Sequence, residues 1–401
     1  MTLLEPAAPA PRSGAIAAAL AAARAALGGG RPDVLVVNDP QRATATPDVL
    51  AQAGACFDLA GVPVVVATGS HAFRAAQRAE LEQACACAAT GAWSWHDARG
   101  AGLVPVAGAG GWRCHPLVAR ARRLLAIGSV EPHYFAGFTG AHKTLTIGCA
   151  AGADIERNHA GAMSPLCRPC RTDGTPVHDG VVAMLRALEQ GRRLAAVNLF
   201  QSGATVVDAA GGAPLAALHA LVPRVRAACL RRIPRPADVL VAEVTGALAC
   251  SFYQAEKGIK NSEWAVRDGG AIVLAAACPQ GIGQDAFTRL LAEAPTHAAA
   301  VAAVRARGYR LGDHKAVRLR FLTDPACRGV RVFAVSPGLS DADAALLGVR
   351  KAATVDEALA EAGFPPDGPG AYRVADAGNT CVEADETPAA AGSFVDASAG
   401  R

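Results

Sequence analysis

Seven short runs of apolar residues recur along the sequence, and most continue without the alternation of a half-exposed strand. Such continuous runs are typical of strands covered on both faces, as in parallel sheets. They lie at residues 33–39, 63–68, 124–128, 194–199, 239–244, 271–276 and 330–336. Ala- and Leu-rich stretches with helical spacing lie between them, for example at residues 73–90 and 214–221. This alternation predicts an α/β protein with mostly parallel sheets.

A proline-rich segment at residues 232–238, RIPRPAD, stands directly before the fifth apolar run. Prolines that flank a charged residue are typical of a connection between domains. We therefore expect an N-terminal α/β domain over residues 1–232 and a smaller α/β domain over residues 233–387. Residues 388–401 are rich in small side chains and are expected to form a disordered tail.

Composition narrows the class of protein. Of the 401 residues, 39 are Lys or Arg and 35 are Asp or Glu, so the net charge is +4. A chain so nearly neutral is not expected to bind nucleic acid, because such proteins usually concentrate basic charge. Hydrophobic residues make up 51% and charged residues 18% of the chain, which is enough for a large core.

The sequence also bears on the compartment. Its apolar stretches fall short of the about 20 residues that a membrane helix needs, so we expect no membrane partner. Residues 1–13 are Pro-rich and lack a basic start, which argues against a secretory signal. The 12 cysteines are then expected to be reduced thiols of a cytoplasmic protein. The oligomeric state stays open.

Polar and ionisable residues gather directly after the predicted strands. Ligands of open α/β sheets bind beyond the carboxyl ends of the strands, so these residues are the candidates for a functional site. They include Asp39, Arg42, Thr68, Gly69, Ser70, His71, His133, Gly137, Gly140, Lys143, Tyr253, Gln254 and Lys257.

Two of these candidates are histidines that follow strands closely. His71 and His133 could exchange the roles of general base and general acid, since histidine titrates near pH ~6.5. A single histidine more often only completes a loop, but two at equivalent strand ends favour catalysis. Arg42 and Lys257 could clamp a carboxylate, and Arg42 could do so through two parallel hydrogen bonds.

Lys143 lies in a glycine-rich segment between Gly137, Gly140 and Gly148. Glycines let backbone N–H groups approach an anion, and lysine can bind phosphate or form a covalent bond. The spacing fits neither a P-loop nor a dinucleotide-binding fingerprint. His159 could ligate a borderline transition metal, although a lone loop histidine is the commoner case.

Other chemistries remain open on these residues alone. Cys167 and Cys170 form a C-x-x-C pair with His178 nearby, a pattern that could bind zinc or support redox chemistry. The sequence holds no second such pair, so incidental thiols are the commoner explanation. A nicotinamide-dependent dehydrogenase would need G-x-G-x-x-G after the first strand, and residues 38–44 lack it.

Five segments, taken in order, resemble the motifs of the nickel-pincer lactate racemases (the LarA type). They are D-P-Q-R at 39–42, A-T-G-S-H at 67–71, P-H-Y-F-A-G-F-T-G-A-H-K at 132–143, N-H at 158–159 and Y-Q-A-E-K at 253–257. The resemblance spans roughly residues 30–320. The chain departs from the family pattern at Gln41 and Ser70, where the family has threonine, and at Ala141, where it has glycine.

The resemblance implies two α/β domains with the active site in the cleft between them. It implies a nickel pincer nucleotide as the cofactor, a pyridinium mononucleotide with two sulfur-containing arms. His159 would be the protein's nickel ligand, and Lys143 would join the cofactor through a thioamide. The neighbouring cofactor-binding residues would be Thr68, Gly69, Ser70, Gly137 and Gly140.

The implied reaction is a racemisation or epimerisation at C2 of a small 2-hydroxy acid, by hydride transfer through a 2-keto acid. His71 and His133 would be the acid/base pair. Arg42, Gln254 and Lys257 would bind the substrate, with Asp39 and Tyr253 beside them. Which 2-hydroxy acid is used stays open, and cofactor biosynthetic enzymes would be needed for activity. The alternative is a non-catalytic carrier or binding protein for the same nucleotide.

Overall fold

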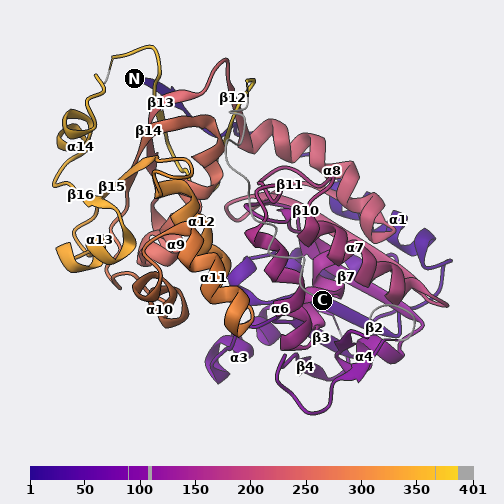
Figure 1. Cartoon of the computed structure of the whole chain (residues 1–401). Coiled ribbons are helices and arrows are strands. Elements are labelled where there is room, and N and C mark those ends of the chain that lie inside the picture. The colour runs from indigo at the N-terminus through magenta and orange to yellow at the C-terminus, as the bar shows by residue number, and fades with distance from the viewer. Residues whose placement is uncertain (89, 107–110, 366, 387–401) are drawn as a thin grey trace.

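The computed structural model describes the whole chain except residues 89, 107–110, 366 and 387–401. It contains two six-stranded sheets, each flanked by helices (Figure 1). We call the part around one sheet the first domain and the part around the other the second domain. The tail expected at residues 388–401 lies outside the described residues.

The sheet of the first domain is mostly parallel. Its spatial order is β11 (Thr205–Gly212), β10 (Arg193–Ser202), β7 (Arg123–Ser129), β2 (Val34–Asn38), β3 (Val64–Ala67) and β4 (Trp93–Trp95). Only β11, at the edge, runs antiparallel to its neighbour. The flanking helices are α1 (Ala15–Ala26), α2 (Thr46–Ala53), α3 (Ala75–Ala84), α4 (Pro116–Arg120), α5 (Ala141–Leu145), α6 (Gly152–Ala160), α7 (Pro176–Glu189) and α8 (Pro214–Cys229).

The sheet of the second domain is parallel throughout. Its order is β1 (Thr2–Leu4), β17 (Ala371–Val374), β13 (Ala237–Glu243), β14 (Val266–Ala275), β15 (Arg331–Val335) and β16 (Arg350–Lys351). Its helices are α9 (Phe252–Ser262), α10 (Asp285–Glu293), α11 (His297–Arg307), α12 (Asp313–Thr323), α13 (Asp341–Leu347) and α14 (Val355–Ala362).

Both sheets are buried on both faces, as their continuous apolar runs predict. Along β2, Val36 packs in one core with Leu185 of α7, while Leu35 packs in another core with Leu20 of α1. All five residues of β2 are buried. Covering each face with helices is the standard solution for parallel strands, and it leaves the strand ends open for a site.

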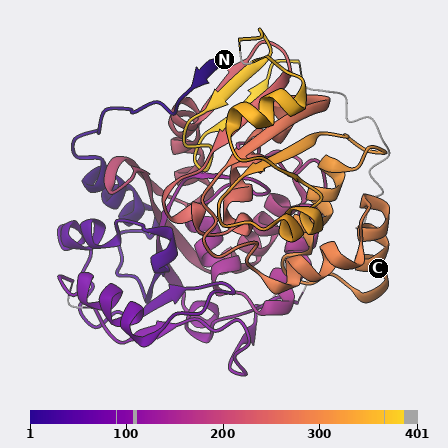
Figure 2. The same cartoon turned by 90° about the vertical axis from the view of Figure 1, so that its left-hand side faces the viewer.

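The chain crosses between the domains in two places. Strand β12 (Leu230–Ile233) pairs with β18 (Cys381–Ala384), and only residues 234–236 separate β12 from β13, so the RIPRPAD segment contains a short connection between two strands. The other crossing is at the N-terminus, where β1 adds an edge strand to the second sheet. Figure 2 shows this N-terminal segment running along the outside of the molecule to the first domain.

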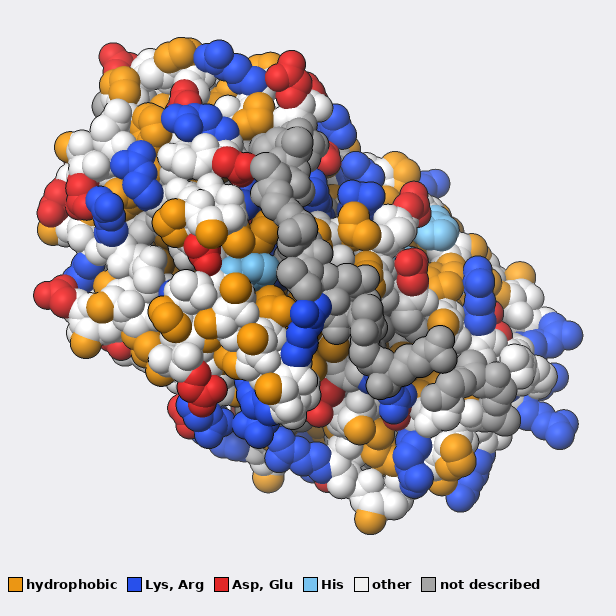
Figure 3. Space-filling view, viewed as in Figure 1, with side chains coloured by type: hydrophobic (Ala, Val, Ile, Leu, Met, Phe, Trp, Pro, Cys, Tyr) orange, Lys and Arg blue, Asp and Glu red, His pale blue; other side chains and the backbone are white. Residues whose placement is uncertain are grey.

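The surface reflects the near-balance of charge. In Figure 3, acidic and basic side chains are mixed over much of the visible face. None of the described helices has the length and apolar character required to span a membrane.

Candidate active site

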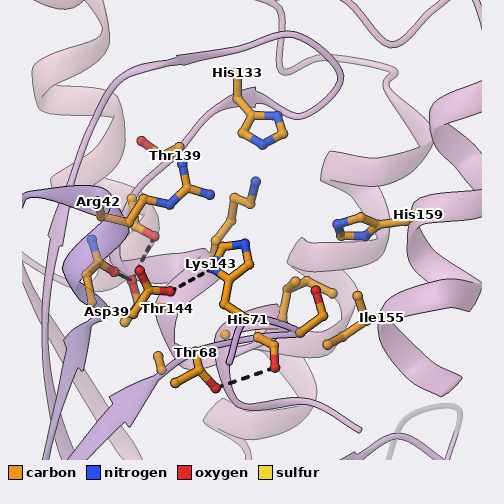
Figure 4. Close-up of a pocket in the computed structure, with 17 residues that line it drawn as sticks. Asp39, Arg42, Thr68, His71, His133, Thr139, Lys143, Thr144, Ile155 and His159 are labelled. Carbon is orange, nitrogen blue, oxygen red and sulfur yellow. Dashed lines mark hydrogen bonds and ion pairs between the residues drawn. The ribbon is translucent and has the colours of Figure 1, made fainter. Parts of the chain in front are cut away.

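A cavity of about 110 Å³ lies at the carboxyl ends of β2, β3 and β7. Because these three parallel strands are neighbours, the segments that follow them meet at one edge of the sheet. Most of the residues expected from the sequence line this cavity (Figure 4): Asp39, Arg42, Thr68, Gly69, Ser70, His71, His133, Gly140, Lys143 and His159. All residues that line it belong to the first domain.

His71 is held by a buried carboxylate. Its Nδ1 lies 3.0 Å from Oδ2 of Asp39, and Asp39 is 5% exposed. The other carboxylate oxygen of Asp39 accepts a hydrogen bond of 2.9 Å from the backbone N–H of Gln41, at the start of a short 3₁₀ helix, Pro40–Arg42. Both oxygens are thus in use, and a carboxylate at Nδ1 favours the tautomer whose Nε2 carries no proton.

His133 lies in a different environment from His71. Burial, followed by the positive charge of Lys143, holds the pKa of His133 well below its usual value. Its Nδ1 is buried and has no hydrogen-bond partner within the described part of the chain. The ring stacks against Tyr134 with 5.6 Å between centroids and meets the edge of Phe135 at 4.4 Å. His133 is therefore a neutral imidazole that can accept a proton.

Lys143 and His159 approach the same space from other sides (Figure 4). Burial, and next the charge of Arg42, holds the pKa of Lys143 well below its usual value. Burial and the charge of Lys143 lower the pKa of His159 to about 3. A lysine with a lowered pKa gives up its proton more readily, and the amine it then exposes is a nucleophile, while a neutral imidazole is a metal ligand.

A hydrogen-bonded floor supports the cavity. The Thr144 hydroxyl donates to the Asn38 amide oxygen at 2.7 Å, and the Asn38 amide donates to the Thr44 hydroxyl at 2.8 Å. The Thr68 hydroxyl donates to the backbone carbonyl of His96 at 2.7 Å, which fixes that side chain at the end of β3. Asn38 stands at the end of the first predicted strand but was not among the expected site residues, and neither was Thr144, which directly follows Lys143 in the sequence.

Four expected site residues lie outside the cavity lining. Gly137 has φ +73°, and a Cβ there would lie 2.1 Å from the Arg171 carbonyl oxygen, so this glycine is required by backbone packing. Tyr253, Gln254 and Lys257 belong to α9 of the second domain and do not line the cavity.

One residue of α9 nevertheless lies near the cavity. The charge of Lys257 contributes to lowering the pKa of His133, which places the lysine within electrostatic reach. Tyr253 packs its ring 3.7 Å from the Lys315 ammonium, and Gln254 is exposed. The active site was expected in the cleft between the domains. The cavity is lined by residues of the first domain, and helix α9 of the second domain lies beside it.

The cysteine pair has no zinc-site geometry. Cys167 and Cys170 are both buried, but they pack in separate hydrophobic clusters. Within the described residues, no three His, Cys, Asp or Glu side chains are placed to hold a metal ion together. The zinc hypothesis therefore lacks the four ligands that a structural zinc requires.

The residues present do fit a pincer-type cofactor. Such a group brings most of its own metal donors, so it needs one neutral imidazole, which His159 would provide. Lys143 has no hydrogen-bond or ion-pair partner among the described residues, and its amine lies in the cavity. A second cavity of about 890 Å³ shares Gly69, Ser70 and His71 with the first. The two together have room for a nucleotide.

These features define a two-domain α/β protein with a histidine- and lysine-lined cavity at the strand ends, the usual location of small-molecule chemistry in this class. The chain belongs to the lactate racemase family. The family's "Lactate racemase N-terminal domain" matches residues 21–167, and its "Lactate racemase C-terminal domain" matches residues 234–364. The two matches fall on the two domains seen in the structure.

Two curated proteins named lactate racemase are similar to the chain. One, from Thermoanaerobacterium thermosaccharolyticum, is 28% identical over 243 residues, which are 58% of this chain and 56% of the relative. The other, from Lactiplantibacillus plantarum, is 25% identical over 185 residues, which are 44% of this chain and 42% of the relative. The matched region thus spans about half the length of these relatives.

Solved structures confirm the fold over nearly the whole chain. The lactate racemase apoprotein from T. thermosaccharolyticum matches with a TM-score of 0.80 at 21% identity, covering 96% of this chain and 95% of that one. A crystal structure of a protein from Thermotoga maritima matches with a TM-score of 0.66 at 14% identity, covering 92% and 97%.

Proposed function

We propose that the protein is a racemase or epimerase that inverts C2 of a small 2-hydroxy acid. The observation that carries this proposal is the pair of histidines, His71 and His133, which line one cavity with Arg42 and Lys143. The names of the two curated relatives support the same reaction class.

Arg42 is the residue for the substrate carboxylate. It lines the cavity, and its side chain has no hydrogen bond or ion pair to another described residue, so its planar guanidinium is available for two parallel hydrogen bonds. Lys257, and with it Gln254 and Tyr253, would approach the substrate from α9. Holding the carboxylate fixes which face of C2 is presented to the reacting groups.

The two histidines then handle the hydroxyl proton. Each is free to take that proton on one ring nitrogen: His133 because it is neutral, and His71 because Asp39 occupies its Nδ1. The two enantiomers present their hydroxyl groups in opposite directions, so one histidine serves as base for each. The other histidine, when it carries a proton of its own, donates that proton to the keto oxygen, and proton exchange with solvent then resets the pair.

The nickel pincer nucleotide is part of this proposal. When bound, it would supply a reversible acceptor for the hydride at C2. His159 would ligate the nickel and Lys143 would form the thioamide bond. Thr68, Gly69, Ser70 and Gly140 would surround the group. The N-terminus of α6 lines the larger cavity, together with Arg99 and Arg113, and would suit the phosphate.

The test is racemisation by protein produced together with the cofactor biosynthetic enzymes. A panel of single enantiomers, including lactate, malate and phenyllactate, is followed by chiral chromatography. Substrate deuterated at C2 should keep its label in the product, because hydride transfer does not exchange with water. His71→Ala and His133→Ala should each lower kcat at least about a hundredfold. The exposed His219 gives the control variant His219→Ala.

The outcomes separate the alternatives. Loss of the label to solvent would contradict hydride transfer while leaving a racemase. Bound nucleotide and nickel without turnover of any acid would favour the carrier hypothesis. A preparation that binds neither, when a known racemase loads normally under the same conditions, would refute the proposal.

A further inference from the structure

Helix α12 of the second domain carries buried polar side chains that contact the first domain. His314 is 3% exposed, and both of its ring nitrogens have partners. Nε2 lies 2.9 Å from the Tyr134 hydroxyl, and Nδ1 lies 2.6 Å from the Tyr309 hydroxyl. A neutral imidazole has one donor and one acceptor, so one phenol donates to the ring and the other accepts from it. This arrangement fixes the His314 ring completely.

Tyr134 is held at two points from α12. Its hydroxyl bonds to His314, and its backbone carbonyl accepts a hydrogen bond of 3.4 Å from Arg318. The Arg318 guanidinium is itself anchored to Glu263 at 2.5 Å, within the second domain. Tyr134 belongs to the first domain, so these bonds join the two domains directly beside the cavity.

Tyr134 in turn supports His133. The two rings are neighbours in sequence and lie nearly parallel, with 5° between their planes. Phe135 packs edge-on against both His133 and Tyr134, and His314 packs against the same Phe135 at 5.0 Å. No described residue forms a hydrogen bond with the buried Nδ1 of His133, so ring packing is what orients the ring.

We propose that His314 is a positioning residue for His133, which acts through its hydrogen bond to the Tyr134 hydroxyl. Through this bond, the orientation of the base in the first domain depends on the position of α12 in the second. The expected effect on turnover rests on the proposed function. The hydrogen-bonded connection from α12 to His133 does not depend on that function.

A double-mutant cycle tests the link. Tyr134→Phe removes only the hydroxyl and keeps the stacked ring, and His314→Phe keeps an aromatic ring and removes both hydrogen bonds. If both substitutions act through the hydrogen bond between Tyr134 and His314, each should lower kcat about ten- to hundredfold with KM nearly unchanged. The double variant should then have a kcat no lower than that of His314→Phe. His314→Gln can still bond to the phenol and should recover much of kcat. Tyr372→Phe, at a buried tyrosine of β17, is the control.

A second readout does not require activity. Amide hydrogen exchange over residues 132–138, measured by mass spectrometry, should speed up about tenfold in Tyr134→Phe and His314→Phe, and less in His314→Gln. Exchange and kcat equal to those of the unsubstituted chain in both Phe variants would overturn the inference. Inactivity of the unsubstituted, cofactor-loaded chain would refute the proposed function instead, and the exchange result would still decide the link.

Discussion

At the scale of single residues, the most specific feature is the pairing of Asp39 with His71. The carboxylate is buried, contacts Nδ1 at 3.0 Å and is itself fixed by a backbone N–H. Asp39→Asn keeps the shape but can present an N–H to the ring, which favours the wrong tautomer. We expect kcat to fall about tenfold to a hundredfold, with cofactor content unchanged. Steady-state kinetics and nickel analysis of the same sample provide the measurement.

The control for this prediction is Asp58→Asn. Asp58 makes a surface ion pair of 3.3 Å with Arg31, of a kind that contributes little to stability. Its replacement should leave kcat unchanged. An Asp39→Asn enzyme as fast as the unsubstituted one would show that His71 needs no carboxylate to act.

Gly137 supports a second prediction at this scale. Its φ of +73° disfavours any side chain, and a Cβ would lie 2.1 Å from the Arg171 carbonyl oxygen. Gly137→Ala should therefore lower the free energy of unfolding by about 3 kcal/mol, since strain and displacement of Arg171 add. Gly174 has φ +65° but open space around its Cβ position, so Gly174→Ala should cost only about 1 kcal/mol.

Urea unfolding of both glycine variants makes the comparison. If both variants lose the same free energy of unfolding, the loop around Arg171 moves aside freely. The close approach of position 137 to the Arg171 carbonyl oxygen would then not be the reason for a glycine there.

Much of the candidate site follows from the sequence because its residues stand directly after strands. Arg42, after β2, and His71, after β3, line the cavity for that reason. His314 could not be found in this way. It stands inside a helix far along the chain, and its importance comes from a contact with Tyr134 across 180 positions. Nothing local in the sequence marks such a contact.

At the scale of elements, all seven apolar runs form strands, because burial on both faces leaves a clear local pattern. The apolar pattern did not predict β11, which is an edge strand that ends in two glycines. It did not predict α12 either. In that helix Lys315, Arg318 and Arg320 are buried, whereas charged side chains usually lie at the surface. Arg320 is satisfied there by four backbone carbonyls, a solution that only the tertiary structure provides.

The contact between β4 and the start of α4 leads to a pH prediction. His115 precedes α4, is 8% exposed and bonds to the Ser94 hydroxyl of β4 at 2.9 Å. Burial, and next the nearby His96, lowers the pKa of His115 to about 4. Between pH 6.5 and pH 4 the unfolded chain therefore binds a proton that the folded chain does not. Stability should be full above pH 6.5 and fall as the pH drops through this window.

The size of this effect can be measured. From pH 7 to pH 5 the His115 contribution should be about 1–2 kcal/mol, allowing for partial screening by solvent. His115→Gln keeps a partner for Ser94 and removes the titration. Urea unfolding of this variant should lose less free energy over the same interval than the unsubstituted chain. Identical pH dependence in the two proteins would mean that His115 binds its proton as readily in the folded chain as in the unfolded one, so that burial does not shift its pKa.

At the scale of the whole molecule, the first 13 residues tie the two domains together. Strand β1 pairs with β17 of the second sheet. Further along, the Ala7 N–H donates to the Ala228 carbonyl at the end of α8, and the Arg12 N–H donates to the Val207 carbonyl in β11. Arg224 and Arg231 add hydrogen bonds of 2.5 Å to carbonyls of the same segment. The N-terminal segment thus connects the two domains at the surface, and the hydrogen bond between Tyr134 and His314 connects them in the interior.

A chain that begins at Gly14 should keep both cores but lose the outer connection. Each lost hydrogen bond is worth about 1 kcal/mol, and the losses fall on both domains, at β17 in the second and around α8 and β11 in the first, so we expect the two domains to unfold in separate transitions. Three of the four tryptophans lie in the first domain and only Trp264 in the second, so Trp264→Phe makes fluorescence report the first domain alone. In that background, urea unfolding by fluorescence and by circular dichroism should coincide in the full chain and separate in the shortened one. Coincident transitions in the shortened chain would mean that the inner contacts alone couple the domains, which would make the Tyr134–His314 bond still more important to the geometry of the site.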